Sequence, residues 1–232
     1  MDSVFEIIGP PMVGPSSSHT AGACRLGLAA RAILAETPAH AQIGLHGSFW
    51  STGQGHGTDQ AIISGLLNRR PEDDRLKSAF EDAKQEHLTF SFEQIDLGLN
   101  AHPNSVKITL TSHPDSESKE TPHSIQMLGS STGGGSILIW EIDSFSVNWN
   151  GTLDALILWH QDEVGFLSRV TTVLACADAN IASIRTSRLH RGENALTLIE
   201  LDAPLRPEVI NFLPILQSVQ KAHYLPSLTR SK

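Results

Sequence analysis

Apolar residues in the second half of the chain follow a regular alternation of strand and helix patterns. Residues 153–159 form a continuous apolar run, which predicts a buried strand. Apolar residues then recur at three- and four-residue steps, which predicts one face of a helix. These residues are Phe166, Val170, Val173, Leu174 and Ala177. Further strands are predicted over 181–189, 195–201 and 219–225, with a second helix beginning at Pro207. The order βαββαβ predicts a ferredoxin-like, split βαβ sandwich.

The first half is less regular and mixes both patterns. Strands are predicted over 5–8, 42–49, 88–95, 105–112, 123–129 and 136–142. Helices are predicted over 21–35, 58–67 and 71–85, with Thr58 as the N-cap of the second. Loops are predicted over 9–20, 51–57 and 113–122. A turn-forming stretch at 148–151 separates the halves. The sequence therefore predicts an α+β fold with one domain over 1–150 and another over 151–232.

Composition narrows the class of protein. The chain has 232 residues, of which 40% are hydrophobic, so it can form substantial cores. Its formal net charge of −8 argues against nucleic-acid binding. The acidic start and the absence of a spanning apolar run predict no secretory segment and no membrane helix. Two cysteines are too few for a disulfide framework or an iron–sulfur cluster, which indicates a cytoplasmic protein. Cys24 and Cys176 lie on faces of predicted helices, so we expect both to be core thiols.

The segment 14–22 combines serines, a threonine and a histidine directly before a predicted helix. A helix N-terminus offers unpaired N–H groups that suit a carboxylate, and the hydroxyls of Ser16, Ser17, Ser18 and Thr20 add donors. The His19 imidazole can exchange a proton near neutral pH. The pattern alone fits a binding site and an elaborate N-cap equally well.

Three further loops carry candidate residues. Residues 53–59 alternate glycines around His56 and end in Gly57, Thr58 and Asp59, without the spacing of a dinucleotide or P-loop motif. Residues 101–104 contain His102 and Asn104, and residues 129–136 contain Gly133 and Gly134. On pattern alone, a flexible turn is favoured for 53–59 and a tight hairpin for 129–136. The histidines show no metal-ligand spacing, so we expect no metal site in this chain.

Four ordered motifs resemble the β subunit of the bacterial iron–sulfur-dependent L-serine dehydratase, an L-serine ammonia-lyase. They are Phe5-Glu6-Ile7-Ile8-Gly9-Pro10 leading to 14–22, Gly47-Ser48-Phe49 with residues 52–59, His102-Pro103-Asn104, and Gly133-Gly134-Gly135. Residues 154–225 resemble an ACT domain, although Glu163-Val164 departs from its usual turn and Ala179 replaces a glycine. Gln60 also stands where the family commonly has lysine.

The resemblance implies an enzyme that deaminates L-serine to pyruvate and ammonia with a 4Fe–4S cluster held by a partner α subunit. It implies His19 and His56 as catalytic residues of this chain. It implies substrate-binding residues at Ser16, Ser17, Ser18, Thr20, Gly57, Thr58, Asp59, His102, Asn104, Gly133 and Gly134. It also implies an allosteric-substrate-binding-like first domain and homo-association through the ACT-like domain.

Two alternatives stay open. The first domain also resembles the allosteric substrate-binding domain of some phosphoglycerate dehydrogenases, which implies a serine-sensing regulatory subunit without catalytic residues. A degenerate, purely scaffolding subunit is the other alternative.

Overall fold

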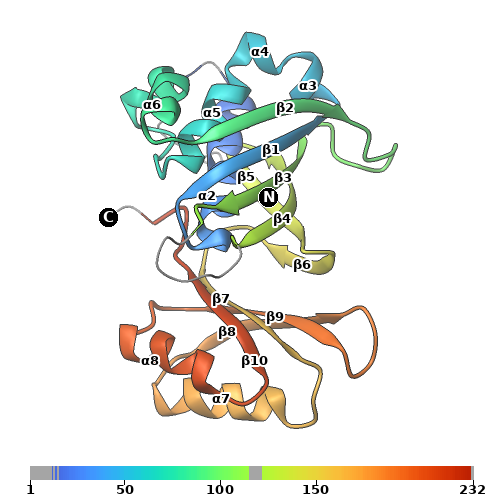
Figure 1. The fold of residues 1–232 in the computed structure, drawn as a ribbon, viewed down its shortest axis with the longest axis vertical. Helices are drawn as coiled ribbons and strands as arrows, with labels where there is room; N and C mark the ends of the chain where they lie inside the picture. Colours follow the sequence, from blue (N-terminus) through green and yellow to red (C-terminus); the bar gives the residue numbers. More distant parts are fainter. Residues whose placement is uncertain (1–11, 13, 15, 115–121, 231–232) are drawn as a thin grey trace, which may run out of the picture. The chain divides into compact units, whose positions relative to one another are not determined.

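Two compact units, Met1–Asp143 and Ser144–Lys232, make up the chain (Figure 1). The computed structural model describes residues 12, 14, 16–114 and 122–230. The units meet at the turn after β5, where Asp143 and Ser144 both have positive φ. The domain boundary predicted after residue 150 lies one strand, β6 (Phe145–Trp149), after this unit boundary, and it stays a prediction. The mixture of helices and two sheets confirms the α+β class.

The first unit contains five strands of a mixed sheet, in the order β2-β1-β3-β4-β5. They are β1 (Pro38–His46), β2 (Thr89–Ile95), β3 (Ser105–Ser112), β4 (Ser124–Gly133) and β5 (Ser136–Ile142). The last strand of this sheet, β6 (Phe145–Trp149), follows the unit boundary along the chain. β1 pairs with β2 in parallel and with β3 in antiparallel orientation. Val106, Ile108 and Leu110 alternate along β3 and are buried, which is the period-two pattern of a strand with one face in a core.

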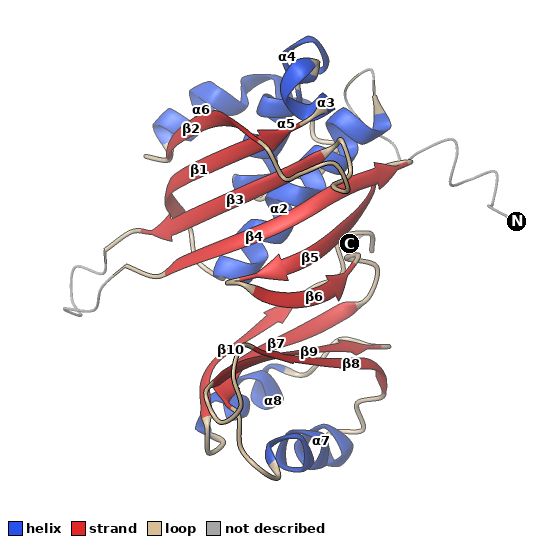
Figure 2. Cartoon of the chain, turned by 90° about the vertical axis from the view of Figure 1, so that its right-hand side faces the viewer, coloured by secondary structure: helices blue, strands red, loops and turns tan. Residues whose placement is uncertain are grey.

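Helices cover one face of this sheet. They are the π-helix η1 (Ser17–Gly22), α2 (Ala23–Leu34), α3 (Ser48–Ser51), α4 (Gly53–His56), α5 (Thr58–Leu66), the 3₁₀ helix η2 (Asp74–Ser78) and α6 (Ala79–Gln85). α2 lies against β3, β4 and β5, as Figure 2 shows, and α5 packs against α2. Both helices are largely buried, because α2 packs against the sheet and α5, and α5 packs against α2 and other helical segments.

Several local predictions for the first unit are wrong. The loop expected over 9–20 ends earlier, because the helix begins at Ser17. The strand expected over 42–49 runs instead from Pro38 to His46, and the glycine loop after it forms the short helices α3 and α4. The strand expected over 5–8 lies outside the described residues. The hairpin prediction for residues 129–136 is confirmed, since Gly134 and Gly135 both have positive φ between β4 and β5.

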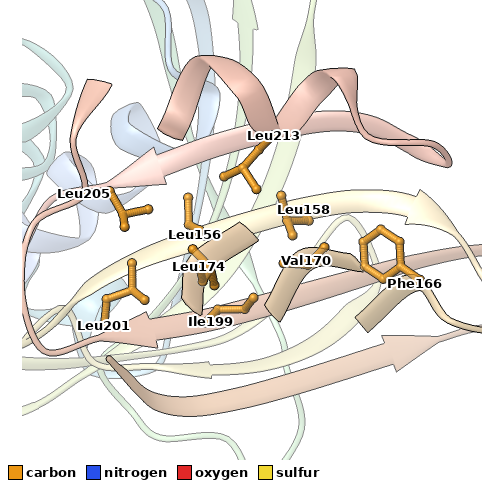
Figure 3. Packing of buried hydrophobic residues seen from close by; sticks show 9 residues of the cluster. All are labelled: Leu156, Leu158, Phe166, Val170, Leu174, Ile199, Leu201, Leu205 and Leu213. Atoms are coloured by element: carbon orange, nitrogen blue, oxygen red, sulfur yellow. The ribbon is translucent and has the colours of Figure 1, made fainter. Parts of the chain in front are cut away.

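The second unit has the predicted element order. It contains β7 (Asp154–Gln161), α7 (Phe166–Cys176), β8 (Ile181–Arg188), β9 (Asn194–Leu201), α8 (Pro207–Phe212), the 3₁₀ helix η3 (Leu213–Ile215) and β10 (Val219–Leu225). The sheet order β10-β7-β9-β8 is that of a split βαβ sandwich. Figure 3 shows Phe166, Val170 and Leu174 of α7 packed with Leu156 and Leu158 of β7 in one buried cluster.

Candidate functional site

His19 lies in the π-helix η1, at the start of the long helical stretch that continues into α2. The Ser16 side chain caps this helix by accepting a hydrogen bond from the His19 N–H over 3.2 Å. The wide turn of a π-helix is rare and occurs often at functional sites, because it displaces side chains from their regular positions. The segment 16–22 is therefore both a helix cap and a device that orients an imidazole.

Two hydroxyl groups contact the His19 ring. Its Nε2 atom lies 3.3 Å from Ser48 Oγ and 3.2 Å from Thr52 Oγ1. These hydroxyls lie 3.1 Å apart because Ser48 and Thr52 are four residues apart on the helical segment after β1. The Phe49 ring packs edge-on against the imidazole, with ring centroids 5.3 Å apart. His19 is thus fixed by polar contacts at Nε2 and an apolar wall.

His56 approaches His19 from the last position of α4. The two imidazole centroids are 5.0 Å apart. The Thr20 hydroxyl donates to the His56 carbonyl oxygen over 3.4 Å, which ties α4 to η1. Gly57, with φ +67°, then redirects the chain into α5, a conformation that costs glycine little. The structure therefore brings together the two histidines predicted as catalytic, although they are 37 positions apart in the sequence.

The environment of His19 favours its neutral form. Burial lowers the pKa of the imidazole, and the neighbouring His56 lowers it further because two positive charges at this distance repel. A neutral imidazole at pH 7 can accept a proton, and the surrounding hydroxyls can orient a polar ligand. The arrangement supports general acid–base chemistry on a small substrate.

The loop 102–104 docks onto the same region through its backbone. The Ser48 and Phe49 N–H groups donate to the Pro103 carbonyl oxygen over 2.8 and 3.4 Å. His102 Nδ1 accepts from the Asn104 N–H over 3.1 Å. This loop supports α3. The described hydrogen bonds of His102 and Asn104 lie within the loop and with Ser105 of β3 and Ser131 of β4, and none of them involves His19 or His56.

Gly133 ends β4 and Gly134 lies in the turn to β5. The Arg25 guanidinium of α2 donates to the Gly135 carbonyl oxygen over 2.6 Å and fixes this turn. β4 and β5 both contact η1, the helix that carries His19. Among the described residues, no hydrogen bond or ring contact joins Gly133 or Gly134 to either histidine.

The N-cap prediction for Thr58 is wrong, whereas the substrate-binding roles of Thr58 and Asp59 stay predictions. Thr58 is the first residue of α5 rather than its N-cap, because Gly57 occupies the cap position without a side-chain bond. Its hydroxyl is buried and has no hydrogen-bond partner among the described residues. Asp59 faces a cleft of about 420 Å³ that is lined by neither His19 nor His56.

The two cysteines do not form a cluster site. Cys24 is buried in α2, where its thiol donates to the Arg69 carbonyl oxygen and burial raises its pKa to about 12. Cys176 belongs to the other unit and is exposed, so its prediction as a core thiol is wrong. Within the described ranges, no three His, Cys, Asp or Glu side chains are grouped to hold a metal. No helix of those ranges is long and apolar enough to cross a membrane.

Sequence reasoning missed Ser48, Thr52 and Phe49 as neighbours of His19. Their segment was expected to be the end of a strand and a loop, in which residues 48 and 52 have no common face. If this segment is assigned as a helix, Ser48 and Thr52 lie on the same face of it. This i,i+4 hydroxyl pair is the signal that would have found them.

The fold and the paired imidazoles define an α+β chain with a serine- and histidine-lined site. The family model described as serine dehydratase beta chain matches residues 3–139. The chain is 41% identical over 204 residues to the L-serine dehydratase beta chain of Peptoniphilus asaccharolyticus, with 88% of each chain covered. It is 36% identical over 217 residues to a probable L-serine dehydratase beta chain of Bacillus subtilis, with 94% of each covered. The chain therefore belongs to the serine dehydratase beta chain family.

A dehydrogenase is also similar to part of this chain. The D-3-phosphoglycerate dehydrogenase of Bacillus subtilis is 26% identical over 155 residues, covering 66% of this chain and 28% of that protein.

Proposed function

We propose that this chain is the β subunit of a cytoplasmic L-serine ammonia-lyase, which converts L-serine to pyruvate and ammonia together with an α subunit. The observation that carries the proposal is the His19–His56 pair, held within 5.0 Å beside serine and threonine hydroxyls in a member of this family. A 4Fe–4S cluster on the α subunit supplies the Lewis-acid chemistry for departure of the substrate hydroxyl. This chain supplies no cluster ligands in the proposal, because its two cysteines lie in different units.

The proposed task of the two histidines is movement of the substrate's α-proton. The neutral His19 imidazole is suited to accept a proton, and Ser48 and Thr52 hold its ring in position. His56 is exposed and adjacent, so it can pass the proton to solvent. Loss of the α-proton and the hydroxyl yields aminoacrylate, which tautomerises and hydrolyses to pyruvate and ammonia.

The substrate carboxylate is proposed to lie at the start of η1. The hydroxyl groups of Ser16, Ser17 and Ser18 provide donors there. The role of Thr20 in substrate binding stays a prediction, because its buried hydroxyl donates to the His56 carbonyl oxygen. The other substrate-binding residues stay predictions: Gly57, Thr58, Asp59, His102, Asn104, Gly133 and Gly134.

The second unit is proposed to be an ACT domain that supports homo-association. Its βαββαβ order and sheet order support this assignment. We also propose that the chain divides into a substrate-binding domain over 1–150 and an ACT domain over 151–232.

A serine-sensing regulatory subunit is the second candidate. The similarity to a D-3-phosphoglycerate dehydrogenase over 66% of this chain favours this candidate, because that protein is named for a different reaction. In that case the histidines bind serine without reacting with it.

Co-expression with the cysteine-bearing α chain of the same genome tests the proposal. We expect the anaerobic complex to form pyruvate from L-serine and the isolated chain to be colourless and inactive after treatment with iron and sulfide. Failure to form an active complex, or one cluster per isolated chain, would contradict the proposal.

A further inference from the structure

A cleft of about 420 Å³ is lined by residues of α3, α4 and α5 and of the strands β1 and β2. Its apolar lining is provided by Leu45, Phe49, Trp50 and Phe92, and its polar lining by Ser51, Gln54 and Asp59. The Phe49 ring is shared, since it lines the cleft and also packs against His19. The cleft and the site are therefore neighbours that one binding partner can cover together.

The charge in the cleft is negative and uncompensated. Asp59 Oδ1 accepts a hydrogen bond from the Gln60 N–H, and no described cation forms an ion pair with this carboxylate. The chain as a whole carries a formal charge of −8. A carboxylate beside the aromatic rings of Trp50 and Phe92 favours a cation, because ring faces also attract positive charge.

The size and position of the cleft favour a protein side chain over free serine. Its volume is in the range that holds a drug-sized group, far more than serine fills. Trp50 is 41% exposed, and exposed tryptophans are characteristic anchors of protein interfaces. α4 lines the cleft through Gln54 and carries His56, so any subunit that completes the histidine site reaches this surface.

We propose that this cleft docks the catalytic α subunit through a lysine or arginine of that subunit. The aliphatic stem of the basic side chain lies against Trp50 and Phe92, and its charged end pairs with Asp59. This inference rests on the proposed function and adds the surface and the chemistry by which the partner is recognised.

Affinity between the purified chain and the purified α chain, measured by calorimetry without serine, tests the inference. We expect Asp59→Asn to weaken binding about ten-fold or more, and Asp59→Glu to retain most of it, because only the first removes the charge. We expect Trp50→Ala to weaken binding about 30-fold, as for an interface anchor. Added salt should weaken the wild-type complex and affect Asp59→Asn much less.

Matched controls separate the cleft from general surface effects. Glu81→Gln removes an exposed carboxylate from α6, and Phe212→Ala removes an aromatic of 45% exposure from α8; both should bind like wild type. Unchanged affinity of Asp59→Asn and Trp50→Ala for the α chain would overturn the inference. It would also be overturned if these variants changed the KM for serine and left assembly with the α chain unchanged. If the wild-type chains do not assemble at all, the proposed function fails as well.

Discussion

Two glycines, Gly27 of α2 and Gly65 of α5, lie where these helices pack tightly against each other. A Cβ atom on Gly65 would lie 2.1 Å from the Cys24 carbonyl oxygen and 2.7 Å from the Leu28 nitrogen. One on Gly27 would lie 2.2 Å from the Ile62 carbonyl oxygen. These are backbone atoms of buried helices, so they cannot yield as a flexible side chain would. Because α2 continues from η1 and α5 follows His56, this contact positions the site.

Gly65→Ala should therefore destabilise the chain although alanine is the better helix former. The helix propensity of alanine favours the variant by about 1 kcal/mol. Relief of the overlap requires the helices to separate by about 1 Å, and overpacking of this kind costs about 1–3 kcal/mol or more. We expect a net loss of about 2 kcal/mol in the free energy of unfolding and a fall of roughly 5–10 °C in Tm.

Urea and thermal unfolding followed by circular dichroism measure this effect, with Gly55→Ala as the matched control. A Cβ atom on Gly55 meets nothing within 4 Å, so this control should keep or slightly raise the stability. If Gly65→Ala is as stable as wild type or more stable, the inferred close packing of α2 and α5 is wrong.

Three further predictions concern buried groups. The free energy of unfolding should fall as pH drops below about 6.5, because burial lowers the pKa of His160 in the folded state and the unfolded chain then binds more protons. Urea titrations at pH 7 and 5 should show a smaller fall for His160→Gln than for wild type. An equal fall in both proteins would contradict this. Arg230→Ala should cost about 2 kcal/mol, because it removes a 2.7 Å partner of the buried Asp154 carboxylate. Unchanged urea unfolding would refute that pairing. A thiol reagent should modify Cys176 rapidly and Cys24 only after denaturation, since the Cys24 thiol is buried with its pKa raised to about 12; mass spectrometry that finds Cys24 modified in the native chain would contradict it.

Elements with a clear hydrophobic period could be predicted from the sequence. The bounds of β3 and β5 agree with the expected 105–112 and 136–142, because apolar alternation marks β3 and a largely apolar run marks β5. The bounds of β10 also agree with the expected 219–225, although its sequence has no regular apolar period. The helices α3 and α4 could not be found this way. Each has four residues, which is too short to show a helical period, and glycines in the segment favoured a loop.

The site could be predicted only in part. The serines, threonine and histidine before the helix predicted from residue 21 fitted a binding site and an elaborate N-cap equally well. In the structure the helix begins at Ser17, and His19 contacts the hydroxyls of Ser48 and Thr52. The contacts of His19 with Ser48 and Thr52 join residues about thirty positions apart, so no local spacing reveals them. Folding of the two short helices against η1 creates that proximity.

The turnover of the assembled α–β complex with His56→Asn tests the central claim most directly. We expect kcat for pyruvate formation to fall by about 10²-fold or more, the usual loss when a general acid or base is removed, with cluster content and assembly intact. The same loss is expected for His19→Asn. Full kcat in both variants, with only regulation by serine lost, would contradict the catalytic role and support the sensor.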